Sequence, residues 1–160
     1  MSNPCSSAMR EKYWGYDAMG YDIERIGRIT GQIDRYMKDL DLFSPDDRSL
    51  AEDRVHFYAL SMVLFSLLDS LIDLGSEILA AQNLGMPGTY RQTFSLLAEG
   101  GIIDKNTLRT LSVLVSYRNR LAHEYGEITP EDLVALLSYK EEIRTFVEKM
   151  KEVVRENQTG

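Results

Sequence analysis

Hydrophobic residues recur every three or four positions along most of this chain, which is the spacing of amphipathic helices. Between Asp17 and Leu40 the pattern predicts a first helix, whose apolar positions are Ile23, Ile26, Ile29, Ile33 and Met37. A second helix is predicted from Pro45 to about Gln82. Because this stretch is almost continuously apolar after Phe57, we expect it to be the central and most buried helix.

Capping and helix-breaking residues divide the rest of the chain. Ser44-Pro45-Asp46-Asp47 and Thr129-Pro130-Glu131-Asp132 each combine an N-cap, a proline at the first helical position and acids in the first turn. A further helix is predicted over residues 89–100, with Thr89 as its cap and Gly100-Gly101 as its C-terminal stop. Asp104 opens the next predicted helix, over residues 104–126, and another follows over residues 130–156. The prediction is an all-α, up-and-down bundle of about five helices over residues 17–156. Residues 1–16 form an N-terminal extension and residues 157–160 a frayed C-terminus.

Composition and charge narrow the function. With 160 residues and a net charge of -7, the chain is one acidic domain, and a broad basic surface that coats nucleic acid is not expected. A small basic cleft remains compatible with this charge. Cys5 is the only cysteine, which excludes an internal disulfide and a cysteine-rich zinc site. No signal peptide is recognised at the start, and three acids interrupt the most apolar stretch, so we expect a cytoplasmic protein without a membrane span.

The usual metal and cofactor motifs are missing from the sequence. There is no glycine-rich phosphate loop, and neither His56 nor His123 belongs to a zinc or di-iron motif, so no metal or cofactor is expected. Three acids, Asp69, Asp73 and Glu77, recur every four residues and should line one face of the second helix. We interpret them as partners of cationic side chains or as a partly hydrated seam, rather than as metal ligands.

The segment richest in side chains that could take part in catalysis or binding lies at the end of the fourth predicted helix. Its functional side chains are Arg118, Asn119, Arg120, His123 and Tyr125. From Lys105 to His123 there are four basic residues and no acid, which makes a local positive island that can hold phosphate. Imidazole is the side chain that exchanges a proton near neutral pH. A purely structural interpretation is also open, because basic residues in the last turn complement the helix dipole and Tyr125 could close the core.

Helix geometry separates the two most reactive side chains. At about 100° per residue, Arg118 and His123 lie about 140° apart, whereas Asn119 and His123 share a face. Arg118 and His123 could act on one phosphate if the helix ends early. They could also do so if a second copy of the chain supplies one of them across a two-fold interface.

These residues carry a family resemblance. Arg118-x4-His123-Glu124-Tyr125 resembles the Arg-x4-His-x-Tyr motif of the HEPN superfamily, in its HepT-like branch. Other segments resemble that branch in order and position, namely Leu84-Gly85-Met86-Pro87, Tyr90-Arg91-x2-Phe94-x2-Leu97-x2-Gly100 and Ile103. The resemblance covers roughly Tyr21 to Val154 and leaves the aromatic residues Tyr13, Trp14 and Tyr16 unexplained.

The resemblance implies a fold, an activity and a partner. It implies a HEPN-like homodimer whose motif lines a cleft between subunits, and a metal-independent endoribonuclease that acts on RNA, not DNA. It further implies a toxin whose antitoxin is a minimal nucleotidyltransferase that adenylates the motif tyrosine. The implied catalytic residues are Arg118 and His123, with Asn119 and Arg120 in support and Tyr125 as the modification site. The alternative is an inactive dimeric module that binds the nucleotidyltransferase or a small nucleotide.

Overall fold

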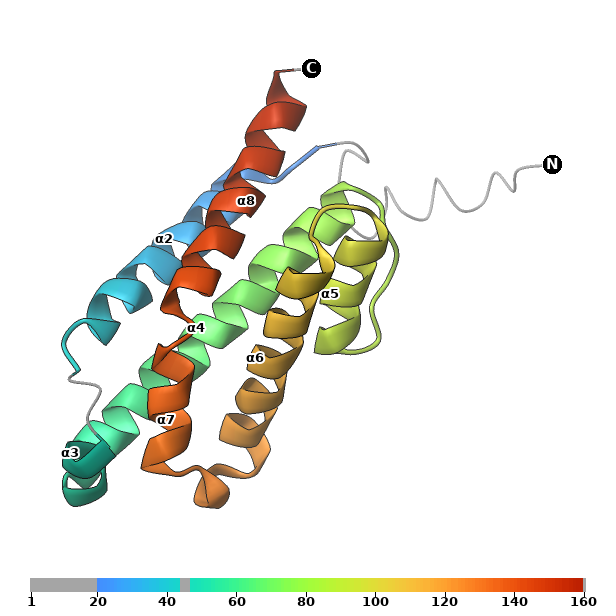
Figure 1. The fold of residues 1–160 in the computed structure, drawn as a ribbon. Coiled ribbons are helices and arrows are strands. Elements are labelled where there is room, and N and C mark those ends of the chain that lie inside the picture. Colours follow the sequence, from blue (N-terminus) through green and yellow to red (C-terminus); the bar gives the residue numbers. More distant parts are fainter. Residues whose placement is uncertain (1–19, 44–46, 160) are drawn as a thin grey trace.

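The computed structural model describes residues 20–43 and 47–159, and all of its secondary structure is helical (Figure 1). These described residues form seven α-helices and one 3-10 helix. The elements in chain order are α2 (Ile23–Leu40), α3 (Asp47–Glu52), α4 (Arg54–Ala81), α5 (Tyr90–Glu99), α6 (Lys105–His123), η1 (Tyr125–Glu127), α7 (Pro130–Leu137) and α8 (Lys140–Gln158). The predicted all-α bundle is therefore confirmed.

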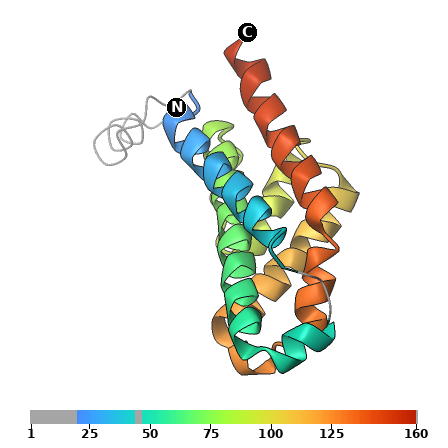
Figure 2. The ribbon, with the colours of Figure 1, turned by 90° about the vertical axis from the view of Figure 1, so that its left-hand side faces the viewer.

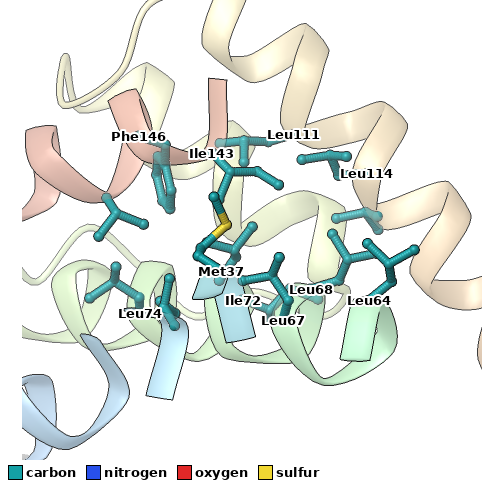
Figure 3. Packing of buried hydrophobic residues seen from close by; sticks show 14 of the residues in the cluster. Met37, Leu64, Leu67, Leu68, Ile72, Leu74, Leu111, Leu114, Ile143 and Phe146 are labelled. Carbon is teal, nitrogen blue, oxygen red and sulfur yellow. The ribbon is translucent and has the colours of Figure 1, made fainter. Parts of the chain in front are cut away.

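The long helix α4 is the centre of the bundle, as its apolar sequence predicted. It contacts α2, α5, α6, α7 and α8, and Figures 1 and 2 show α2 and α5 on opposite sides of it. Side chains from α2, α4, α6 and α8 meet in one core (Figure 3). The labelled members are Met37, Leu64, Leu67, Leu68, Ile72, Leu74, Leu111, Leu114, Ile143 and Phe146. Full burial of such side chains stabilises the fold by about 1.5–3 kcal/mol each.

By length and composition alone, α4 could also cross a membrane, the one helix of the described residues that could. Here most of its apolar side chains from Leu60 to Leu79 fill the centre of the bundle.

The predicted start and end of α5 and the predicted start of α6 form as hydrogen-bonded structures. Thr89 Oγ1 accepts the Gln92 amide at 3.2 Å, and Asp104 Oδ1 accepts the Thr107 amide at 2.7 Å. Helix α5 ends in a Schellman motif, in which the Ile102 amide donates to the Leu97 carbonyl at 2.9 Å. Gly101 has φ +75°, a left-handed conformation that glycine adopts without a Cβ penalty.

Two predicted helices are each divided in the structure. The second is interrupted at Asp53, where the backbone is extended and the side-chain Oδ1 caps α4 by accepting the Val55 and His56 amides at 3.0 and 3.1 Å. The fifth is interrupted at Ser138, whose hydroxyl donates to the Ala135 carbonyl at 2.6 Å. Aspartate and serine can thus end a helix by offering the backbone a competing hydrogen bond.

The remaining boundaries differ by a few residues. Helix α2 begins at Ile23 with Asp22 as its cap, α6 ends at His123 rather than near Gly126, and α8 continues to Gln158 rather than fraying after residue 156. The N-terminal extension over residues 1–16 and the cap at residues 44–46 lie outside the described residues.

Candidate active site

The candidate site lies at the C-terminal end of α6, where the helix gives way to a short turn. The Glu124 amide closes α6 by donating to the Arg120 carbonyl at 2.8 Å, and η1 follows directly. Buried Ile128 then anchors the chain against the core before α7 starts. This sequence of helix end, 3-10 turn and helix start places His123 and Tyr125 at one corner of the bundle.

Arg118 faces the interior and is held from three sides. Its Nε donates to Asp69 Oδ1 on α4 at 2.6 Å, and its guanidinium lies 5.0 Å from the centre of the Phe65 ring and 4.6 Å from that of the Tyr90 ring. Only 10% of the side chain is exposed, against 39% for Asp69. The hydrogen bond to Asp69 raises the pKa of Arg118 above its ordinary value. Arg118 is therefore a fixed cation, and its remaining guanidinium N–H groups are the ones that could reach a ligand.

The acidic stripe of α4 pairs mainly with cations, as interpreted from the sequence. Glu77 forms an ion pair with Arg25 at 2.6 Å, and Asp69 forms one with Arg118, also at 2.6 Å. Asp73 lies between them, and burial together with the negative charge of Asp69 raises the pKa of its carboxyl group. In the described part of the chain, no three acidic, histidine or cysteine side chains cluster as metal ligands would.

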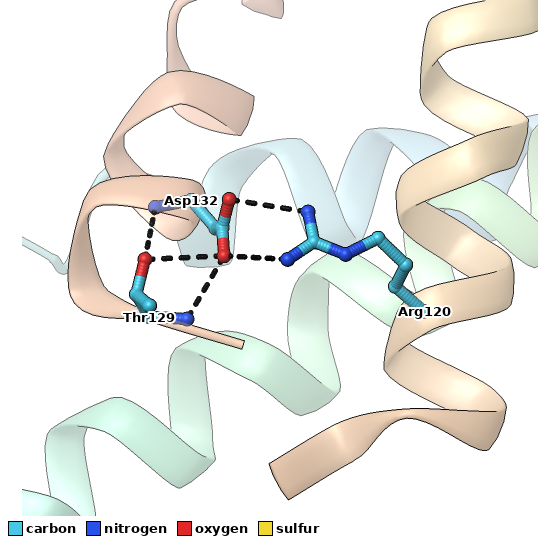
Figure 4. Close-up of polar contacts among 3 residues, drawn as sticks. All are labelled: Arg120, Thr129 and Asp132. Carbon is cyan, nitrogen blue, oxygen red and sulfur yellow. Dashed lines mark hydrogen bonds and ion pairs between the residues drawn. The ribbon is translucent and has the colours of Figure 1, made fainter. Parts of the chain in front are cut away.

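Arg120 connects α6 to the start of α7 (Figure 4). Its two terminal nitrogens donate to the Asp132 carboxylate at 3.2 and 3.0 Å, and Asp132 also accepts the Thr129 amide at 2.9 Å in a capping box. Burial acts to raise the pKa of Asp132, but hydrogen bonds from Arg120 and Thr129 outweigh it and hold that pKa below its ordinary value. Arg120 thus fixes the two ends of the turn that carries Tyr125.

Asn119 and His123 point away from the core. Both side chains are exposed, and they lie one helical turn apart on the same face of α6. Asn119 lines a cavity of about 550 Å³ between α6 and the start of α5. Within one chain the structure thus separates exposed His123 from buried Arg118, as the helical angle predicted.

Tyr125 lies on η1 and packs against the N-terminal part of α4. Its ring stacks on Tyr58 with centroids 5.9 Å apart, and it meets the Phe57 ring edge-on at 6.4 Å. The residue is still 37% exposed. Both interpretations of Tyr125 therefore find support, because the ring packs while part of the side chain faces solvent.

The partners of the motif arginines were not predicted. Asp69 was expected to pair with a cation, but not with Arg118 in particular, and Asp132 was identified only as a cap. Asp69 is 49 positions from Arg118 along the chain, so local pattern could not reveal the pair. Phe65 gave no signal, and Tyr90 entered only through the family resemblance. Together the two aspartates neutralise Arg118 and Arg120, two of the three arginines of the predicted positive island.

Fold and site define an all-helical bundle with an arginine and a histidine near the end of one internal helix. Residues 33–153 match the family Ribonuclease HepT-like, which is more than half of the chain. The protein therefore belongs to the HepT-like ribonuclease family. The chain is also similar to the mRNA nuclease HepT of Shewanella oneidensis, with 29% identity over 84 residues. That match covers 52% of this chain and 63% of the relative's length.

Solved structures share the fold. The cytosolic protein YutE from Bacillus subtilis superimposes with a TM-score of 0.74 at 18% identity, over 85% of this chain and 92% of its own. A tri-AMPylated Shewanella oneidensis HEPN toxin in complex with MNT antitoxin superimposes with a TM-score of 0.73 at 24% identity, over 79% of this chain and 96% of the toxin chain. A chain of a toxin–antitoxin structure with AMP-PNP superimposes with a TM-score of 0.72 at 23% identity, over 78% of this chain and 96% of its own length. At these identities the likeness concerns the fold.

Proposed function

We propose that this protein is a toxin that cleaves RNA without a metal ion. The observation that carries the proposal is the placement of Arg118, Asn119, His123 and Tyr125 at the end of α6 in a chain of the HepT-like ribonuclease family. The similarity to an mRNA nuclease supports RNA as the substrate, with DNA not expected. We further propose that the protein acts in the cytoplasm.

The proposed reaction uses His123 for proton transfer and Arg118 for charge stabilisation. An imidazole accepts the proton of the ribose 2′-hydroxyl, and the 2′-oxygen attacks phosphorus as the bond from phosphorus to the 5′-oxygen breaks. A second imidazole, from the other subunit, donates a proton to the departing 5′-oxygen. The products are a 2′,3′-cyclic phosphate and a 5′-hydroxyl. The guanidinium of Arg118 stabilises the charge that develops on the phosphate oxygens, and Asn119 orients the reacting groups.

A homodimer would bring Arg118 and His123 to one substrate. Exposed apolar side chains on one face of α4 support such an interface: Val55 is 78% exposed, Met62 63% and Tyr58 44%. Contiguous exposed apolar surface of this kind is typical of protein–protein contacts. Since Tyr125 stacks on Tyr58, an interface on this face would lie beside the motif.

Two further residues act on the site by positioning. Asp69 binds the Nε of Arg118, which leaves the two terminal nitrogens of the guanidinium for a phosphate. Arg120 supports the site through its ion pair with Asp132, which holds the turn between α6 and α7. Neither role requires direct contact with RNA.

The proposed antitoxin partner is a minimal nucleotidyltransferase that adenylates Tyr125. The partly exposed side chain of Tyr125 makes it accessible to such an enzyme, and the AMPylated HEPN toxin with the same fold supports this modification. An adenylate on Tyr125 would add bulk and negative charge beside the motif and would compete with the RNA phosphate for its cations.

The proposal is tested by incubating the purified chain, without partner, with labelled single-stranded RNA in the presence of a chelator. We expect cleavage with cyclic phosphate ends, and a loss of about 10²–10⁴-fold in rate for His123→Ala. The matched control is His56→Ala, which removes the chain's other histidine, an exposed residue paired with Asp53. Unchanged cleavage by folded His123→Ala, or cleavage that requires an added divalent ion, would refute the proposal.

A second candidate function rests on the pairing of Arg118. Its burial and its ion pair with Asp69 would also suit a structural arginine in an inactive module that binds the nucleotidyltransferase or a small nucleotide. In that case the wild-type chain binds its partner but leaves the labelled RNA intact.

A further inference from the structure

One face of α6 carries only polar and basic side chains along its whole length. At about 100° per residue, five positions lie within about 40° of His123. These are Lys105, Arg109, Ser112, Ser116 and Asn119, all of them exposed or partly exposed. Since α6 contains no acid, this face, which we call the α6 stripe, is a local exception on a chain of net charge -7.

Helix α5 adds a second arginine beside the α6 stripe, which itself contains Arg109. Arg91 is exposed, and its Nη2 donates to Ser116 Oγ at 3.0 Å, which holds the guanidinium against the stripe. Among the described residues Arg91 makes no ion pair, whereas Arg118 and Arg120 are each neutralised by an aspartate. No neighbouring carboxylate among the described residues therefore offsets the positive charge of Arg91, and its remaining donors suit a phosphate group.

An open cavity beside Arg91 is large enough for one nucleotide. Its volume of about 550 Å³ falls within the range of small-molecule sites. Arg91 and Asn119 line it together with Tyr90, a residue that is 43% exposed and whose ring centre lies 4.6 Å from the Arg118 guanidinium. A base can stack on such an aromatic ring whatever its identity, and the Asn119 amide can both donate and accept hydrogen bonds.

We propose that this cavity is a subsite for one nucleotide of the RNA substrate, next to the cleaved bond. Arg91 binds a backbone phosphate, Tyr90 stacks with the base, and Asn119 hydrogen-bonds to the same nucleotide. The subsite joins the two halves of the motif, because Tyr90 touches Arg118 and Asn119 lies one turn before His123 on the α6 stripe. This inference rests on the proposed ribonuclease function and names where the substrate lies.

The test measures binding of a fluorescent single-stranded RNA oligonucleotide to the full chain by anisotropy, in a His123→Ala background that does not cleave. We expect Arg91→Gln to weaken binding about tenfold. It should also reduce the slope of log affinity against log salt by about 0.7, the amount for one phosphate contact on a single strand. The matched control is Arg35→Gln, which removes the charge of an exposed arginine on α2, on the other side of α4. It should bind like the background protein.

Tyr90 gives an independent arm of the same test. Tyr90→Phe keeps the ring and should bind like the background, whereas Tyr90→Ala should lose about tenfold in affinity. Circular dichroism verifies that each variant is folded. If Arg91→Gln and Arg35→Gln change RNA affinity equally, or if Arg91→Gln impairs only the binding of a nucleotidyltransferase partner, the subsite is refuted.

The outcome for the subsite is separable from that of the proposed function. Wild-type cleavage of RNA together with a neutral Arg91→Gln variant would overturn the subsite alone. A wild-type chain that neither binds nor cleaves RNA would overturn both.

Discussion

The ion pair between Asp69 and Arg118 should stabilise the fold, and its removal gives a measurable prediction. The pair is intermediate between two known cases. Exposed ion pairs contribute about 0.2–1 kcal/mol, and the loss of one partner from a fully buried pair costs about 3–5 kcal/mol. Arg118 is 10% exposed and Asp69 39%, so we expect Asp69→Ala to lower the free energy of unfolding by about 2 kcal/mol.

Replacing the other partner, Arg118, should lower the free energy of unfolding by more. Arg118→Ala removes the ion pair and also the contacts of the guanidinium with the Phe65 and Tyr90 rings, at 5.0 and 4.6 Å. Each such cation–π contact adds about 0.5–1 kcal/mol. Arg118→Met keeps most of the aliphatic packing and should fall between wild type and Arg118→Ala.

The assay is urea unfolding followed by circular dichroism for wild type, both single variants and the double variant. All samples need the same protein concentration, because dimerisation would shift the apparent stability. We expect a coupling energy of about 1–2 kcal/mol between the two residues. In a chain of 160 residues, the Asp69→Ala effect corresponds to a fall in Tm of about 4–8 °C. A coupling energy near zero would show that the two charges are independent and would refute this account of Arg118.

Two other substitutions test neighbouring features. Asp73→Asn should raise stability slightly, by about 0.5 kcal/mol or less, since burial and the charge of Asp69 raise the pKa of Asp73. A carboxyl with a raised folded-state pKa destabilises the fold as pH rises through that value, so the gain should be present at pH 7 and vanish below about pH 4. An Asp73→Asn variant that is less stable than wild type at pH 7 would contradict this prediction. Tyr125→Phe should keep the stack on Tyr58 and the wild-type Tm, but mass spectrometry after co-expression with the nucleotidyltransferase should find no adenylate. An adduct on the phenylalanine variant would move the modification to another residue.

The main features of the fold were predictable because they depend on local chemistry. Apolar spacing identified the helices, and Thr89, Asp104 and Thr129 marked three of their starts through side-chain caps. The division at Asp53 was not predicted, because no glycine or proline lies near it in the sequence. The break at Ser138 has no glycine or proline to announce it.

The sequence predicted how the site residues are arranged around α6, but not which residues they contact. Helical geometry alone separates Arg118 from His123 and aligns Asn119 with His123. Which residue would neutralise each arginine depends on how α4, α6 and α7 pack, and no local pattern encodes that arrangement. Asp69 and Asp132 are therefore the residues that only the tertiary structure could assign to the motif.

These pairings change how the protein can recognise RNA. In an acidic chain, a buried arginine needs a carboxylate partner, and the partner also cancels its long-range attraction for a phosphate backbone. Arg118 can thus act at short range, through donors fixed by Asp69. The longer-range attraction falls to Arg91 and to Lys105 and Arg109 of the α6 stripe, which form no ion pair within the part of the chain that the structure describes. Few phosphates can be bound in this way, so we expect a shallow salt dependence and an affinity that owes much to base stacking on Tyr90. Stacking is strongest for bases that are free of a duplex, which favours unpaired RNA segments as substrates over double helices.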